Sequence, residues 1–106
     1  MAKYLIVGKY NSDGMKGICR EGGAARRSTV ADIVKNLGGN LESFYFAFGE
    51  NDVYSVIDLP NNVSAAAMAM HISASGTTEV NVTVLLTPEE IDKAARTELF
   101  FRPPGT

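Results

Sequence analysis

The sequence contains one cysteine, one histidine and no tryptophan in 106 residues. With Cys19 alone, neither an intrachain disulfide nor a cysteine-based metal cluster can form. Cys19 follows Met15 and Ile18 in a helical pattern, so we expect it to be a small buried hydrophobe. With His71 alone, a metal site would have to be completed by carboxylates. We therefore expect no metal.

Strong net charge and long apolar runs are also lacking. Ten basic residues against twelve acidic ones give a formal net charge of -2, without the basic footprint of a nucleic-acid-binding protein. No apolar run approaches the roughly 18 residues of a membrane span, and residues 1–8 enter a strand instead of a signal peptide. No phosphate loop, dinucleotide fingerprint or nucleophile elbow occurs. We expect a cytoplasmic protein with no cofactor and no nucleic-acid or membrane partner.

The clearest feature that is present is a β-hairpin between Asn40 and Leu59. Its first strand, Asn40–Phe48, carries three phenylalanines on one face, because successive strand side chains alternate: Phe44, Phe46 and Phe48. We expect Phe46 to be buried. A turn with one glycine and two acids leads into the second strand, Asp52–Leu59. An isolated hairpin is marginally stable in water, so other elements must pack on it.

Before the hairpin, Tyr4–Tyr10 is a strand that is apolar on both faces. Apolar residues at three-and-four spacing then predict one long helix from Met15 to Leu37, ended by a left-handed glycine cap at Gly38-Gly39. The pair Gly22-Gly23 lies inside this helix, where each glycine costs roughly 1 kcal/mol relative to alanine. We favour a kink or a close contact between helix and sheet over a gap in which a ligand approaches the backbone.

After the hairpin, the pattern predicts a helix from Val63 to Ser75 and a strand from Thr77 to Leu86. A short helix follows, with Thr87 as its N-cap, proline at its first position and Glu90 closing a capping box. We assign residues 1–96 to the domain and 97–106 to a C-terminal tail. Because this tail contains three large apolar residues, Leu99, Phe100 and Phe101, we expect it to pack on its own domain or on a neighbouring subunit.

The order of elements predicts an α+β fold of the ferredoxin-like βαββαβ type, with two helices on one face of an antiparallel four-stranded sheet. The first three strands carry apolar or aromatic residues on both faces, yet the two helices cover one face. An uncovered apolar face of this size predicts an interface. We expect a homodimer or higher homo-oligomer in which two sheets meet face to face as an α/β barrel.

Several runs taken together resemble the GYD domain family, over Tyr4 to about Ala95. They are Glu21-Gly-Gly-Ala-Ala-Arg-Arg27, Leu37-Gly-Gly-Asn-Leu-Glu-Ser-Phe-Tyr-Phe-Ala-Phe-Gly-Glu50, Asp58-Leu-Pro60, Ser73-Ala-Ser-Gly76 and Leu85-Leu-Thr-Pro-Glu-Glu90. The resemblance implies a ferredoxin-like domain of the dimeric α/β barrel superfamily. Relatives in that superfamily include cofactor-independent monooxygenases, isomerases, haem enzymes and effector-binding modules of transcription regulators.

The signature turn departs from the family pattern at one position. The family has glycine, any residue, tyrosine and aspartate, and this chain has Gly49, Glu50, Asn51 and Asp52. Asparagine tolerates the left-handed conformation of a tight turn, so we expect the hairpin to form with Asn51 in place of tyrosine.

Five residues are candidates for ligand binding: Tyr10, Arg26, Tyr45, Asp58 and His71. The tyrosines and the aspartate present polar tips on sheet faces and would line a cavity between sheet and helices. An arginine can bind a carboxylate or phosphate, but a helical arginine is more often solvated or paired with an acid such as Glu21. The histidine could shuttle protons, or complement the dipole at the end of its helix.

These observations favour a small homo-oligomer that binds a small, partly apolar molecule in a pocket of the barrel. One alternative is an enzyme of the cofactor-independent monooxygenase or isomerase type, in which Tyr45, His71 or Asp58 polarises or deprotonates a substrate. Another is a structural assembly module that needs no pocket.

Overall fold

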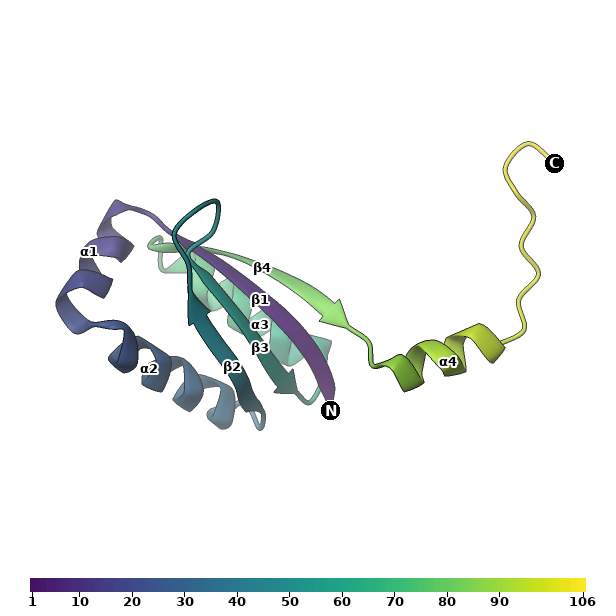
Figure 1. Ribbon diagram of the computed structural model, residues 1–106, viewed down its shortest axis with the longest axis horizontal. Helices are drawn as coiled ribbons and strands as arrows, with labels where there is room; N and C mark the ends of the chain where they lie inside the picture. The colour runs from purple at the N-terminus through teal and green to yellow at the C-terminus, as the bar shows by residue number, and fades with distance from the viewer.

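The computed structural model describes residues 1–106 and contains one four-stranded antiparallel sheet with the order β2-β3-β1-β4 (Figure 1). The elements in chain order are β1 (Ala2–Tyr10), α1 (Ser12–Glu21), α2 (Gly23–Asn36), β2 (Asn40–Phe46), β3 (Val53–Leu59), α3 (Asn62–Ala74), β4 (Thr78–Leu85) and α4 (Pro88–Arg96). The predicted α+β, ferredoxin-like fold is confirmed.

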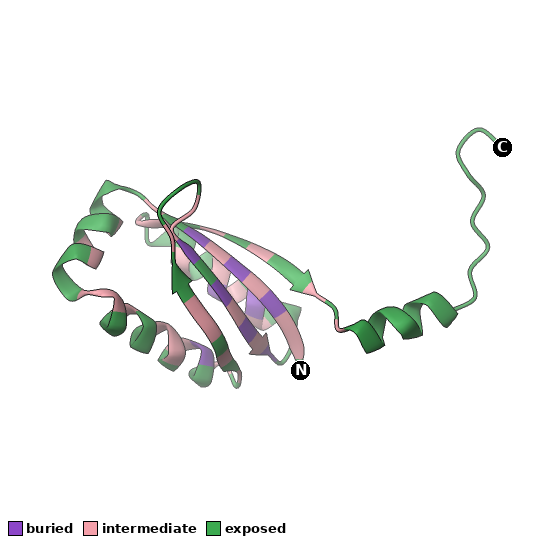
Figure 2. Cartoon of the chain, in the orientation of Figure 1, coloured by how far each residue is buried: buried purple, intermediate pink, exposed green.

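One face of the sheet is covered by α2 and α3, and the core lies beneath them (Figure 2). Alternate residues of β1 and β3 point into this layer and meet one residue of α2 and two of α3. The core residues are Tyr4, Ile6, Ile57, Leu59, Val34, Ala65 and Met68. Small side chains in α3 let this helix lie close to the strands. The intervening residues of the same strands form the opposite face, which no helix covers; we call it the open face.

The long helix expected between Met15 and Leu37 is instead two helices, because Gly22 has a φ of +86° that a continuing helix cannot accommodate. Glycine adopts this conformation without the steric cost that other residues meet. At Gly23, a Cβ atom would come within 3.0 Å of the Phe46 ring. The glycine pair therefore makes both a break and a close contact between helix and sheet, and the predicted left-handed cap is present at Gly38, with a φ of +84°.

The aromatic residues of β2 are less buried than a core strand requires. Phe44 and Phe46 contact each other edge to face on the covered side of the sheet, but Phe46 keeps 41% of its surface exposed. Phe48 lies in the turn and is fully exposed, because β2 ends at Phe46. The expectation of a buried Cys19 is also wrong, since Cys19 lies on the solvent side of α1.

The chain after β4 extends away from the sheet (Figure 1). The predicted capping box is present: the Thr87 hydroxyl accepts from the Glu90 backbone, and the Glu90 carboxylate accepts from the Thr87 backbone. Every residue from 88 to 106 is exposed (Figure 2), so the tail does not pack on its own domain, which was the first of the two expected alternatives; packing on a neighbouring subunit stays a prediction. The radius of gyration, 16.9 Å, reflects this extension, since a compact chain of this length has about 13 Å. No helix is long and apolar enough to cross a membrane.

Candidate functional site

A groove runs between α2 and α3 and opens onto the covered face of the sheet. Its outer part has a volume of about 560 Å³ and lies between the two helices. Its inner part, about 90 Å³, lies against β1, β3 and β4 and is mainly apolar. The two parts are continuous, because they share five lining residues: Arg26, Ile33, Met68, Ile72 and Thr78. A mainly apolar hollow with a few convergent polar groups is the usual form of a small-molecule site.

Two polar side chains reach the inner part of the groove from its end. Arg26 comes from the first turns of α2, and its Nε donates to a Glu21 carboxylate oxygen at 2.5 Å. Tyr10 comes from the last position of β1 and is half-buried. Burial is the main reason that the pKa of the Tyr10 phenol is raised, and the Arg26 charge opposes this rise. The phenol therefore remains a hydrogen-bond donor at neutral pH.

The signature turn ties the hairpin to the end of β1 beside this site. The Asp52 carboxylate accepts a hydrogen bond from the Tyr10 backbone N–H at 2.8 Å. The Asp52 backbone N–H donates to the Gly8 carbonyl, and the Asp52 carbonyl accepts from the Ala47 N–H. Asn51 donates from its side chain to the Tyr54 hydroxyl at 3.4 Å. The hairpin forms with asparagine as expected, but no non-glycine residue has a positive φ, so the left-handed conformation is not used.

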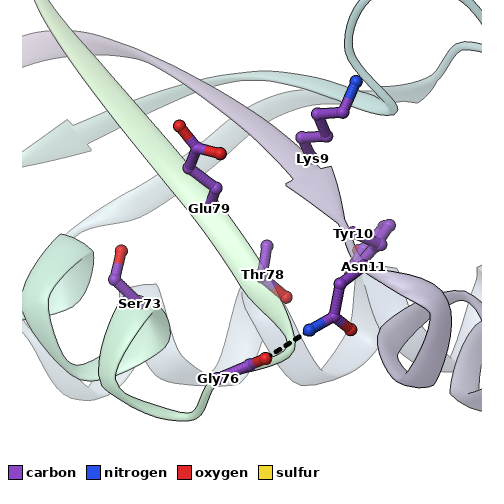
Figure 3. Close-up of a pocket in the computed structure, with 7 residues that line it drawn as sticks. All are labelled: Lys9, Tyr10, Asn11, Ser73, Gly76, Thr78 and Glu79. Atoms are coloured by element: carbon purple, nitrogen blue, oxygen red, sulfur yellow. Dashed lines mark hydrogen bonds between the residues drawn. The ribbon is translucent and has the colours of Figure 1, made fainter.

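A second, polar hollow of about 380 Å³ adjoins Tyr10 at the same end of the sheet (Figure 3). The Asn11 side chain there donates to the Gly76 carbonyl and links β1 to the turn before β4. Lys9 and Glu79 bring one charge of each sign to its wall. This hollow is wide and polar, so it offers less apolar surface to a ligand than the groove does.

The five predicted ligand residues divide between the two faces of the sheet. Tyr10, Arg26 and His71 line the groove, and His71 lies in its outer part on α3. Tyr45 and Asp58 lie on the open face instead. The register gives the reason, because both residues alternate with residues that point to the covered face. Arg26 pairs with Glu21, which was one of the expected alternatives.

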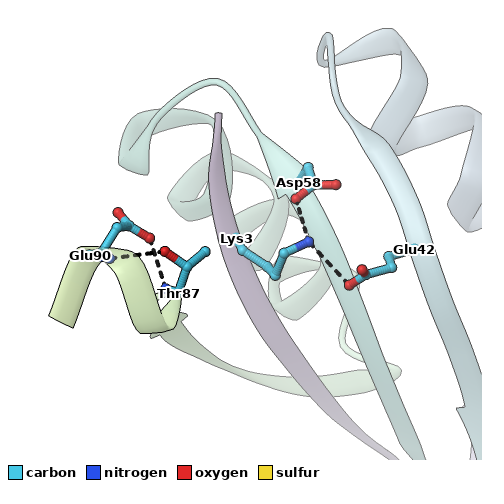
Figure 4. A network of polar contacts seen from close by, with 5 residues as sticks. All are labelled: Lys3, Glu42, Asp58, Thr87 and Glu90. Carbon is cyan, nitrogen blue, oxygen red and sulfur yellow. Dashed lines mark hydrogen bonds and ion pairs between the residues drawn. The ribbon is translucent and has the colours of Figure 1, made fainter. Parts of the chain in front are cut away.

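On the open face, Asp58 belongs to a small charged cluster (Figure 4). The Lys3 ammonium lies 2.8 Å from an Asp58 oxygen and 3.1 Å from a Glu42 oxygen. The pKa of Lys3 is raised mainly by its hydrogen bond to Asp58 and, to a smaller extent, by its hydrogen bond to Glu42. On the same face, Tyr45 and Tyr54 form a cross-strand pair. No group of three His, Cys, Asp or Glu side chains lies close enough together to hold a metal ion.

The residues that sequence reasoning missed are the apolar walls of the groove: Val30, Ile33, Phe44, Met68, Ile72 and Val80. Helical and strand spacing mark a buried face without showing where that face is incompletely filled, so the sequence did not distinguish these residues from core residues. The distance between α2 and α3 leaves the space, and no local pattern encodes that distance.

A family model for the GYD domain matches residues 4–95. This chain belongs to the GYD domain family. The matched residues of this GYD domain include the whole sheet apart from the start of β1, all of α1, α2 and α3, and most of α4. They contain both the groove and the signature turn. Comparison with curated proteins and with solved structures gave no significant match.

Proposed function

We propose that this GYD domain binds a small, partly apolar molecule in the groove between α2 and α3. The supporting observation is the inner part of the groove, where nine of thirteen lining residues are hydrophobic and Arg26 and Tyr10 converge on one end. An apolar body would displace water from this surface, and the polar end would fix its orientation.

The proposed assembly is a homodimer or higher homo-oligomer in which two open faces meet. Its support is the mixture of side chains on that face. Leu5, Val7 and Val56 lie half-buried at its centre, and the Tyr45 and Tyr54 pair is exposed at one side. A second copy would cover these side chains while leaving the groove on the outside of each protomer.

Amide NMR with three naphthalene derivatives, one neutral, one anionic and one cationic, tests the binding proposal without assuming a charge type. We expect at least one compound to shift the resonances of Val30, Met68 and Ile72. Ala67 lines the groove, and its neighbour Ala66 is exposed and does not. Ala67→Phe should therefore remove binding, and Ala66→Phe should retain it. Shifts confined to the open face, or no shifts with any compound, would refute the proposal.

A further inference from the structure

We propose that the groove selects an uncharged, mainly apolar molecule with one hydrogen-bond-accepting oxygen, such as a ketone, over an anion of the same shape. This inference rests on the proposed binding function and specifies its ligand class. It follows from two features of the groove's polar end, namely which donors are free and how the charges around them sum.

The donors at this end are unoccupied. The Glu21 carboxylate accepts a hydrogen bond from the Arg26 Nε, so the two terminal Nη groups of the guanidinium have no partner in the chain. The Tyr10 hydroxyl has no hydrogen-bond partner in the chain, since the bond between Tyr10 and Asp52 is made by the Tyr10 backbone N–H. Both residues line the inner part of the groove. An acceptor oxygen placed there can receive hydrogen bonds from the guanidinium and from the phenol.

The charges around these donors disfavour an anion. Arg26 is paired with Glu21, and the Asp52 carboxylate lies against the Tyr10 backbone, so the charged groups beside these donors are one cation and two carboxylates. The adjoining polar hollow adds Lys9 and Glu79, which cancel. An anionic ligand would therefore enter a region with one excess negative charge and would compete with Glu21 for the same guanidinium. A neutral oxygen accepts the same hydrogen bonds without that repulsion.

A cationic ligand is disfavoured for a different reason. An ammonium group offers donors and no acceptor, whereas the free guanidinium groups of Arg26 are themselves cationic donors that repel it, which leaves the Tyr10 oxygen as its acceptor among the free groups. The two carboxylates are already engaged, Glu21 with Arg26 and Asp52 with the Tyr10 backbone. The only polar group that satisfies the free donors without adding to the charge imbalance is an uncharged acceptor.

The test compares two ligands of nearly equal shape, 2-acetylnaphthalene and 2-naphthoate, by NMR titration of the intact chain. We expect the ketone to bind at Val30, Met68 and Ile72 at least about tenfold more tightly than the carboxylate, since one uncompensated charge is worth about this factor near a surface. If the carboxylate binds there equally or more tightly, the selectivity inference is wrong and the binding proposal stands. If neither compound binds in the groove, the inference is wrong, and the cationic derivative then decides whether the binding proposal survives.

Variants at the polar end separate charge from packing. Glu21→Gln keeps an oxygen that can hold the Arg26 Nε but removes one negative charge. It should improve naphthoate binding about fivefold and change ketone binding less than about twofold. Arg26→Met should weaken the ketone about tenfold through the loss of a charged hydrogen-bond donor. Arg27→Met, at an exposed neighbour outside the groove, should leave it unchanged. Equal effects of the two arginine variants would contradict the assigned role of Arg26.

Discussion

The two faces of the sheet are built from alternate residues of the same strands, yet their environments differ. In β3, Ile57 is completely buried beneath the helices, whereas its neighbour Val56 is half-buried on the open face. In β1, Tyr4 and Ile6 are core residues, whereas Leu5 and Val7 have no helix above them. All of these side chains are apolar or aromatic, so hydrophobicity alone does not show which face a domain covers with its own elements.

The covered face is also incompletely filled. At one end of the sheet, Ala65 of α3 and Val34 of α2 seal the core. At the other end, the two helices leave the groove that Arg26 and Tyr10 border. The domain therefore has a well-packed half that provides stability and an open half that is available to a ligand. The open face differs from both halves of the covered face, because it carries the charged cluster of Lys3, Glu42 and Asp58 beside its apolar centre.

The largest expected difference between the faces is in stability. Ile57→Ala should lower the free energy of unfolding by about 2 to 5 kcal/mol, because it leaves a cavity in a filled core. Val56→Ala removes a smaller and half-exposed side chain, and should cost about 1 kcal/mol or less at low protein concentration. Urea unfolding followed by circular dichroism measures both values. Equal costs for the two variants would contradict the distinction between the faces.

If the open faces meet in a homodimer, Val7→Asp should weaken association about a hundredfold, or about 3 kcal/mol, because an unpaired charge would be buried at the interface. The monomer should keep its fold, since Val7 contributes nothing to the core cluster. Ala66→Asp, on the exposed side of α3, is the matched control and should leave association unchanged. Light scattering after gel filtration measures the oligomeric state. A parent protein that is monomeric at all concentrations refutes the proposed interface.

Two glycines extend the comparison to the helices. Gly17 has open space where a Cβ would be, so Gly17→Ala should raise stability by up to about 1 kcal/mol through helix propensity. At Gly23 the same change places a Cβ 3.0 Å from the Phe46 ring of the covered face, and the ring must move to accept it. Gly23→Ala should therefore give no gain, or a loss of about 1 kcal/mol. Thermal unfolding compares the pair, and an equal gain at both sites would show that the contact with Phe46 is loose.

The smallest expected effect is at alkaline pH, where each face has one group with a raised pKa: Lys3 on the open face and Tyr10 on the covered face. For both groups the folded state favours the protonated form, so their stabilising effect is present below the ordinary pKa and is lost as pH rises through the folded value. Lys3→Met and Tyr10→Phe should each make the fall in melting temperature above about pH 9.5 less steep than in the parent, since the ordinary pKa values of both groups lie near 10. A steeper fall in either variant than in the parent would contradict the raised pKa of the residue replaced.

Local signals predicted most of the fold. Turn residues and two-residue alternation located the strands to within about two residues at each end, and the capping box at Thr87 is present as predicted. The errors have physical reasons. Hydrophobic spacing continued across Gly22, so the break required knowledge of its backbone conformation. Phe46 has the alternation of a core residue but lies on edge strand β2, where fewer neighbours cover it.

For the candidate site, the sequence by itself determined the residue types: a lone histidine, an arginine after a glycine pair, tyrosines on strands, and an acidic turn that differs from the GYD pattern only at Asn51. Only the tertiary structure decided which of them meet. Strand register places Tyr45 and Asp58 on the open face, whereas Tyr10, Arg26 and His71 line one groove. The physical reason is that side-chain type and local periodicity act over a few residues, whereas the groove depends on how far α2 and α3 stand apart across the sheet. That spacing results from packing between segments distant in the chain.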